Sequence, residues 1–262
     1  MKRLVIITGD GREHKYVTNA LCKAYDVAAI LVCDPPAKRS WKKVLKRNPE
    51  QFLGKALRGV FLKITRDREA REASLARVLG DTSERFERAD IVQRVGKPKA
   101  GGLFKAVQAL QPHVLAIYGT GMIPDNVLES AGDIALNMHT GISPHYRGVS
   151  CAMWPILDER PDMVGATVHE CTSAVDGGRV FFTGQASLQS DDNLHTVFAR
   201  AVEVGAQGYV TVVGEVLQGT AVGEEQDHAI GTEYRGKDLH IRTELAARRA
   251  LKRLRKSGRL AT

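Results

Sequence analysis

The chain begins with Lys2-Arg3-Leu4-Val5-Ile6-Ile7-Thr8, an apolar run that ends at the turn residues Gly9-Asp10-Gly11. A helical stretch near Lys15–Ala24 follows, and then a second apolar run, Val27-Ala28-Ala29-Ile30-Leu31-Val32-Cys33, which Asp34-Pro35-Pro36 stops. Short apolar runs bounded by turn residues predict buried strands, and a helix between two of them indicates a parallel βαβ unit. This opening therefore predicts an α/β fold.

The rest of the chain extends the same pattern. Further strands are predicted at His113–Tyr118, Ile134–His139, Gly165–Thr172 and Arg179–Leu188, and helices at Gly101–Leu110, Cys151–Asp158 and from Asp191-Asp192, as N-cap residues, to Leu217. We predict an open, doubly wound (Rossmann-like), mostly parallel sheet with helices on both faces. In such folds ligands bind beyond the carboxyl ends of the strands.

Two regions depart from the alternation of strands and helices. Residues 34–80 form a charged, helical insertion with interruptions near Asn48-Pro49 and Gly59. From Val222 the composition is polar, and Glu244–Lys256 is a basic helix for which Gly258 is a suitable stop. We therefore predict a catalytic domain over residues 1–220 and a C-terminal extension, a polar loop and a basic helix, over residues 221–262.

Composition and charge narrow the class of protein. Of the 262 residues, 43% are hydrophobic and 26% are charged, as in an ordinary globular protein. The net charge is +8, and seven basic residues and no acidic ones lie between Leu245 and Thr262, with a second basic stretch over Lys38–Arg71. Basic segments attract phosphates, acidic substrates or nucleic acid, but solvated helix faces explain them equally well.

The sequence gives no indication of a membrane-spanning protein, a secreted protein or a zinc-binding protein. No apolar run approaches the roughly 20 residues that span a bilayer, and the basic start gives way to a turn too early for a signal peptide, so we expect a cytoplasmic protein. The four cysteines form no C-x-x-C pair and have no histidine cluster beside them. We expect reduced thiols and no zinc site.

The segment that carries chemistry is Asn137-Met138-His139-Thr140-Gly141-Ile142-Ser143-Pro144-His145-Tyr146-Arg147-Gly148. Alternation along a strand puts Asn137 and His139 on one face, where an amide and an imidazole can donate to the same oxygen. Such aimed donors suit the oxyanion of an acyl transfer, at about 10²–10³ in rate each. Taken alone, an Asn-x-His pair is more often structural.

A second segment, Gly165-Ala166-Thr167-Val168-His169-Glu170-Cys171-Thr172, leads to Ser173-Ala174-Val175-Asp176-Gly177-Gly178. An aspartate before two glycines lies in a loop whose backbone can approach a ligand closely. Its carboxylate could orient His139, keep that ring cationic and take part in proton transfer. His169 fits a packed core histidine better than a catalyst.

The two segments, in this order and 37 residues apart (176 − 139), resemble the 10-formyltetrahydrofolate-dependent formyltransferase family. That family includes glycinamide ribonucleotide, methionyl-tRNA and sugar N-formyltransferases and formyltetrahydrofolate hydrolase. The matching residues are Asn137, His139, Pro144, Arg147, Gly148, Gly165, Thr167, His169, Asp176 and Gly178. The resemblance implies Asn137, His139 and Asp176 as catalytic residues, 10-formyltetrahydrofolate as co-substrate, and no metal.

The same resemblance implies where the ligands bind. The folate head is expected between two loops, at Ile117, Tyr118, Gly119, Met122, Ile123, Thr172, Ala174 and Val175. For the acceptor we select Gly11 and Arg12, at a strand-to-helix turn whose N–H groups suit anions, together with Ser143 and Arg147 after the histidine.

The acceptor is less clearly indicated than the reaction. The family's usual Ser-Leu-Leu-Pro run is replaced by Thr140-Gly141-Ile142-Ser143-Pro144, and only about 45 residues follow Leu217, which counts against the added barrel of a tRNA formyltransferase. We favour a small-molecule amine. The alternatives are hydrolysis of the folate, a methionyl-tRNA acceptor, or a nucleic-acid-binding protein on a catalytically idle fold. The sequence leaves the oligomeric state open.

Overall fold

The computed structural model describes residues 2–35 and 49–261, and its centre is a seven-stranded sheet in the order β3-β2-β1-β4-β5-β7-β8. The strands are β1 (Leu4–Thr8), β2 (Val27–Cys33), β3 (Val92–Gly96), β4 (Val114–Tyr118), β5 (Ile134–His139), β7 (Gly165–Glu170) and β8 (Val180–Gln185). The first five pair in parallel, whereas β5–β7 and β7–β8 are antiparallel. The prediction of a mostly parallel, Rossmann-like sheet is confirmed.

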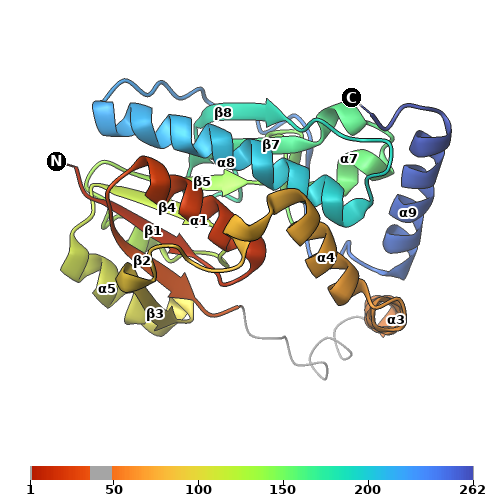
Figure 1. The fold of residues 1–262 in the computed structure, drawn as a ribbon, viewed down its shortest axis with the longest axis horizontal. Helices are drawn as coiled ribbons and strands as arrows, with labels where there is room; N and C mark the ends of the chain where they lie inside the picture. The colour runs from red at the N-terminus through yellow and green to blue at the C-terminus, as the bar shows by residue number, and fades with distance from the viewer. Residues whose placement is uncertain (1, 36–48, 262) are drawn as a thin grey trace.

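Helices cover both faces of the sheet. For this reason β1 and β4, at the centre of the sheet, are buried along their whole length. One face packs against α1 (Arg12–Ala24), α4 (Asp67–Leu79) and the long α8 (Leu194–Gln218), which crosses the sheet in Figure 1. The other face packs against α5 (Gly102–Leu110) and α6 (Asp125–Leu128). Two apolar layers on either side of one sheet form the core.

Two details of these elements differ from the sequence prediction. The edge strand β3 was not predicted, because its residues are polar or only half-buried and show no strand pattern. The cap of α8 is Asn193, whose side-chain oxygen accepts hydrogen bonds from the N–H groups of His195 and Thr196 at 2.8 and 3.0 Å. The predicted cap Asp192 instead accepts from Arg200 Nε at 2.6 Å.

The charged insertion contains two helices, α3 (Pro49–Ile64) and α4, and residues 36–48 of this prediction lie outside the described part of the chain. Gly59 lies within α3, so the interruption expected there is wrong. The break falls instead at Thr65–Arg66, where Arg66 adopts a left-handed conformation with φ 49°.

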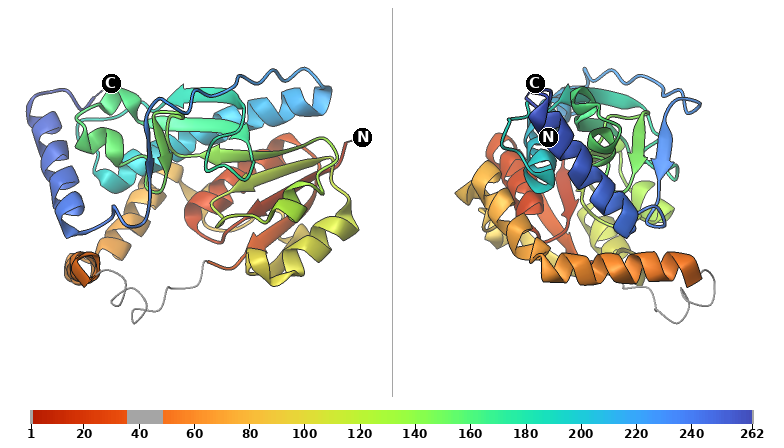
Figure 2. Two further views of the ribbon diagram at one scale, coloured as in Figure 1. Left: turned by 180° about the vertical axis from the view of Figure 1, so that it is seen from behind. Right: turned by 90° about the vertical axis from the view of Figure 1, so that its right-hand side faces the viewer.

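Residues after α8 run back along the molecule before the last helix, as Figure 2 shows. A small sheet pairs β6 (Tyr146–Gly148) with β9 (Thr232–Tyr234), next to α7 (Trp154–Leu157), and the basic α9 (Ile241–Lys256) ends the fold. Single 3₁₀ turns lie at Asp81–Ser83, Ala89–Ile91, Pro98–Ala100 and Pro161–Met163. Among the described helices, none combines the length and apolar character that crossing a bilayer requires.

Candidate active site

The three predicted catalytic residues lie together. Asn137 and His139 occupy the last half of β5, and the hairpin loop between β7 and β8 folds back so that Asp176 reaches them. Asp176 Oδ2 lies 3.5 Å from His139 Nδ1, and Asp176 Oδ1 lies 3.4 Å from His169 Nε2. Asn137 Nδ2 lies 3.1 Å from the same His169 Nε2. A carboxylate, two imidazoles and an amide therefore form one cluster.

His169 is the member of this cluster that the sequence interpretation missed. It is 2% exposed, as expected of a core histidine, but its ring contacts both Asn137 and Asp176. The cause is the strand pairing, since β7 runs antiparallel to β5 and Asn137 is paired with His169. Periodicity within one strand carries no signal for a partner on another strand.

Backbone contacts fix the ring nitrogens that face the centre. His139 Nε2 lies 3.0 Å from the carbonyl oxygen of Tyr146, so this nitrogen carries a proton and Nδ1 is left facing Asp176. His169 Nδ1 likewise donates to the carbonyl of Glu170 at 2.7 Å. His169 Nε2 then accepts from the Asn137 amide when the ring is neutral, and donates to Asp176 when the ring is protonated.

Charge and burial set the protonation states. Burial by itself raises the pKa of Asp176, but the charges of His139 and His169 and the Gly148 N–H, 2.8 Å from Oδ2, outweigh it and lower the pKa to about 2. Burial lowers the pKa of His139, and the Asp176 carboxylate opposes that shift. Asp176 is thus an anion at neutral pH, and it is the group that favours a proton on His139.

The end of β4 and the loop that follows it carry five of the expected folate-binding residues. Ile117 and Tyr118 are buried, and the Ile117 carbonyl accepts a hydrogen bond from Tyr209. Gly119 adopts φ +66°, and its carbonyl lies 3.1 Å from His14 Nε2. The Met122 side chain is 68% exposed, whereas Ile123 is buried.

The loop between β7 and β8 carries the other three, Thr172, Ala174 and Val175, and all three are exposed. Val175, 38% exposed, directly precedes Asp176. Each of the two loops therefore presents an uncovered apolar side chain, Met122 on one and Val175 on the other.

The residues selected for the acceptor have different surroundings. Gly11 is the N-cap of α1 and donates its N–H to His14 Nδ1 at 2.8 Å. Arg12 is bound to Ser83 and Glu84, and therefore has part of its charge neutralised. Ser143 is buried, whereas Arg147 Nη1 lies 3.3 Å from His228 Nδ1, close to the Asp176 loop.

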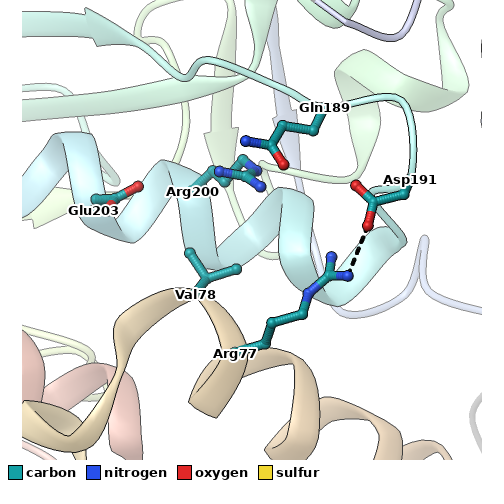
Figure 3. A pocket seen from close by; sticks show the side chains of 6 residues that line it. All are labelled: Arg77, Val78, Gln189, Asp191, Arg200 and Glu203. Atoms are coloured by element: carbon teal, nitrogen blue, oxygen red, sulfur yellow. Dashed lines mark hydrogen bonds and ion pairs between the residues drawn. The ribbon is translucent and has the colours of Figure 1, made fainter.

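A separate hollow of about 350 Å³ lies between α4 and α8 (Figure 3). Its lining residues are Arg77, Val78, Gln189, Asp191, Arg200 and Glu203. Both lining arginines form ion pairs, Arg77 with Asp191 at 2.8 Å and Arg200 with the buried Asp192 at 2.6 Å. No member of the histidine–aspartate cluster lines it, so we assign this hollow to the structural contact between two helices.

The cysteines have the properties of packed thiols. All four are free, and burial raises the pKa of Cys22 and Cys33 to about 11 and that of Cys171 to about 12. Protonated thiols are poor nucleophiles and poor metal ligands. In the described ranges, no group of three or more His, Cys, Asp or Glu side chains is arranged to hold a metal ion.

These features define the class: an α/β protein with a Rossmann-like sheet and a half-buried carboxylate between two imidazoles. The chain belongs to the formyl transferase family, because residues 1–213 match the model of that family, described as formyl transferase. The family suggested by the sequence motifs is therefore confirmed.

Curated relatives and solved structures agree with this family. A methionyl-tRNA formyltransferase of Desulfotalea psychrophila is 26% identical over 138 residues, which are 52% of this chain and 42% of the relative. The chain thus spans about half the length of the curated relatives it matches. A 4-N formyltransferase from Francisella tularensis shares the fold with a TM-score of 0.60 and 13% identity, over 95% of this chain and 87% of that one.

A third protein is an N-formyltransferase from Helicobacter canadensis, solved in complex with folinic acid and dTDP-3-aminofucose. Its TM-score is 0.58 at 13% identity, and the likeness covers 96% of this chain and 81% of that chain. At 13% identity these two structures show that the fold is shared. The curated relatives are named methionyl-tRNA formyltransferases, whereas the Helicobacter canadensis protein was solved with dTDP-3-aminofucose.

Proposed function

We propose that this protein transfers a formyl group from 10-formyltetrahydrofolate to the amine of a small-molecule acceptor, with Asn137, His139 and Asp176 at the reactive centre. The observation that carries the proposal is the position of Asp176. A carboxylate from a distant loop lies within 3.5 Å of two imidazoles, next to an amide on the same strand as one of them. This is the set of groups that acyl transfer to an amine needs.

The loops beside the cluster suit a pterin ring. Met122 and Val175 are large apolar side chains left 68% and 38% exposed, one on each of the two loops that border the cluster. Covering such side chains with a flat ring would be favourable, because apolar surface leaves water. We propose that these loops hold the folate, which supplies the activated formyl group when it is bound.

Each catalytic side chain then has a distinct task. The Asn137 amide has two N–H groups, of which His169 accepts one, so the second is free to donate to the formyl oxygen. His139 presents Nδ1 toward Asp176, and a proton there can be shared with an oxygen that gains negative charge. Asp176, an anion at neutral pH, holds that proton in place and relays a second proton, through water, from the attacking amine to the folate nitrogen, as the bond between this nitrogen and the formyl carbon breaks.

The proposal is tested by incubating the protein with 10-formyltetrahydrofolate and a panel of amines that includes amino sugars and amino acids. Release of tetrahydrofolate that depends on one amine, together with mass-spectrometric detection of its formamide, is the expected result. Rapid release without any amine, with formate as product, would assign the protein to hydrolysis instead. No folate turnover under any condition contradicts the proposal.

A second acceptor, an aminoacyl-tRNA, is favoured by one feature of α9. Arg242, Arg249 and Lys256 are exposed and seven residues apart, and the exposed Lys252 lies beside them. Seven residues are two helical turns, so these charges form one stripe. If α9 binds tRNA, a gel shift will weaken steeply with salt, and Arg242→Glu with Arg249→Glu will abolish it. Absence of binding at low salt eliminates this acceptor.

A further inference from the structure

The polar segment after α8 contacts the loop that carries Asp176. Gln226 Nε2 lies 2.9 Å from the carbonyl oxygen of Asp176 and 2.6 Å from that of Gly178. One amide group therefore donates both of its hydrogens to two carbonyls of a single loop. Gln226 is half-buried, and it lies beyond residue 213, where the match to the family ends.

His228 holds the carbonyl between these two. Its Nε2 lies 2.9 Å from the carbonyl oxygen of Gly177, so Nε2 carries the proton. Its other nitrogen, Nδ1, is 3.3 Å from Arg147 Nη1 and accepts from that guanidinium. Three consecutive carbonyls, those of Asp176, Gly177 and Gly178, are thus bound by two side chains of one segment.

The segment over residues 224–234 also supports the strand whose Gly148 N–H binds the Asp176 carboxylate. At its start, Glu224 exchanges two backbone hydrogen bonds of 2.8 Å with Val180 in β8. At its end, β9 pairs with β6, and the Gly148 N–H in β6 donates to Asp176 Oδ2 at 2.8 Å. Residues 224–234 therefore hold Asp176 from two sides, through its backbone and, indirectly, through its side chain.

We propose that residues 224–234 form a clasp that sets the position of Asp176, and that Gln226 and His228 are positioning residues for the reaction. The conformation of Asp176 gives the reason a clasp is needed. Its φ is +47°, a left-handed conformation that residues other than glycine rarely adopt and that persists where surrounding contacts enforce it. Without the clasp, the loop is free to relax and to carry the carboxylate away from His139.

The test is Gln226→Glu, which preserves size but replaces two donors with a carboxylate facing two carbonyl oxygens. Glu225→Gln, at the exposed neighbouring position, is the matched control, because it replaces a carboxylate with an amide, the reverse of the test substitution. In the Gln226→Glu variant we expect kcat to fall by at least about tenfold with little change in KM, since small misplacements of reacting groups cost up to about 10²-fold. The control is expected to keep the wild-type rate.

A second readout does not depend on activity. The titratable groups that act on the pKa of His139 are Asp176, which raises it, and His169, which lowers it. If Asp176 moves away, His139 titrates at lower pH, which NMR of the labelled ring, assigned with His139→Ala, will show. This measurement tests the clasp even if the wild-type protein turns over no folate, whereas the kcat test rests on the proposed function.

A pair of variants at the second contact covers the case in which Gln226→Glu does not fold. His228→Gln retains a donor for the Gly177 carbonyl, so we expect it to keep most of the wild-type kcat and an unchanged His139 titration. His228→Ala has no such donor, so we expect a lower kcat and a His139 titration shifted to lower pH. The clasp is refuted if Gln226→Glu, or His228→Ala when the former does not fold, shows wild-type kcat and an unchanged His139 titration.

Discussion

At the scale of single residues, Asp176 is the group on which the others depend. His139 and His169 are buried and have their outer nitrogens bound to backbone carbonyls, so each presents one remaining nitrogen to the same carboxylate. Asn137 completes the cluster through His169. Removing the charge of Asp176 therefore lowers the pKa of His139 as well as removing the role of the carboxylate itself.

Substitution of the trio is expected to abolish most of the activity. Asn137→Ala, His139→Ala and Asp176→Asn should each lower the rate of folate release by at least about 10², because each removes a donor or the charge that orients one. Circular dichroism melts serve as the control for folding. Near-normal turnover in any one variant would remove that residue from the proposed mechanism.

The low pKa of Asp176 predicts a pH dependence of stability. A carboxyl whose pKa falls from 3.8 to about 2 on folding stabilises the native state at pH values above 3.8, and this contribution disappears as the pH falls through about 2. The difference in free energy of unfolding between wild type and Asp176→Asn should therefore shrink by about 2 kcal/mol between about pH 5 and about pH 2. Urea titrations across that range measure it, and a constant difference would contradict the assignment.

At the scale of elements, the α8 cap shows how a local choice is decided. Three consecutive residues, Asp191, Asp192 and Asn193, are all suitable N-caps. Asp192 is fully buried beside Arg200, and Asp191 pairs with Arg77, which leaves Asn193 to bind the free N–H groups of the helix. Arg77 from α4 and Arg200 from within α8 itself therefore determine which of the three residues caps the helix.

Asn193→Ala is expected to lower the free energy of unfolding by about 1 kcal/mol, since two N–H groups of the first turn lose their acceptor. The control is Asp191→Ala, whose side chain is 63% exposed and whose surface ion pair should contribute only a few tenths of a kcal/mol. Chemical denaturation of the two variants compares them. An equal or larger loss in free energy of unfolding for Asp191→Ala would indicate that Asp191, and not Asn193, caps the helix.

At the scale of the whole molecule, the C-terminal helix is packed into the core. Leu254 in α9 is fully buried, in a cluster with Val164, Val197 and Ala201 from the body of the fold. Ion pairs such as Arg58–Glu244, at 3.1 Å, join α9 to the helical insertion. The exposed basic residues of α9 therefore lie opposite a buried face that is mostly apolar.

Leu254→Ala should lower the stability of the entire chain by about 2–5 kcal/mol, because it opens a cavity between α9 and α8. Leu245→Ala, at a partly exposed position of the same helix, is expected to cost less. Thermal unfolding followed at several wavelengths distinguishes the outcomes. If α9 melts separately and the main transition is unchanged in Leu254→Ala, the helix is not part of the core.

Local patterns in the sequence predict those elements whose signal lies within a short stretch of the chain. The strands β1, β2, β4 and β5 are apolar runs bounded by turns, and period-two alternation placed Asn137 and His139 on one face. The resemblance of the two motif segments, in their order and separation, to those of a known family also indicated the family. All these signals are contained within short stretches of the chain or in their order.

Contacts between distant stretches of the chain follow from the way the strands and loops pack, and no local pattern predicts them. The antiparallel pairing of β7 with β5 brought His169 to Asn137, and the return of residues 224–234 placed Gln226 against the Asp176 loop. The physical reason is that side-chain periodicity and turn residues fix the conformation of a few neighbouring positions. Which strand pairs with which, and in which direction, depends instead on burying apolar surface and satisfying hydrogen bonds across the whole chain.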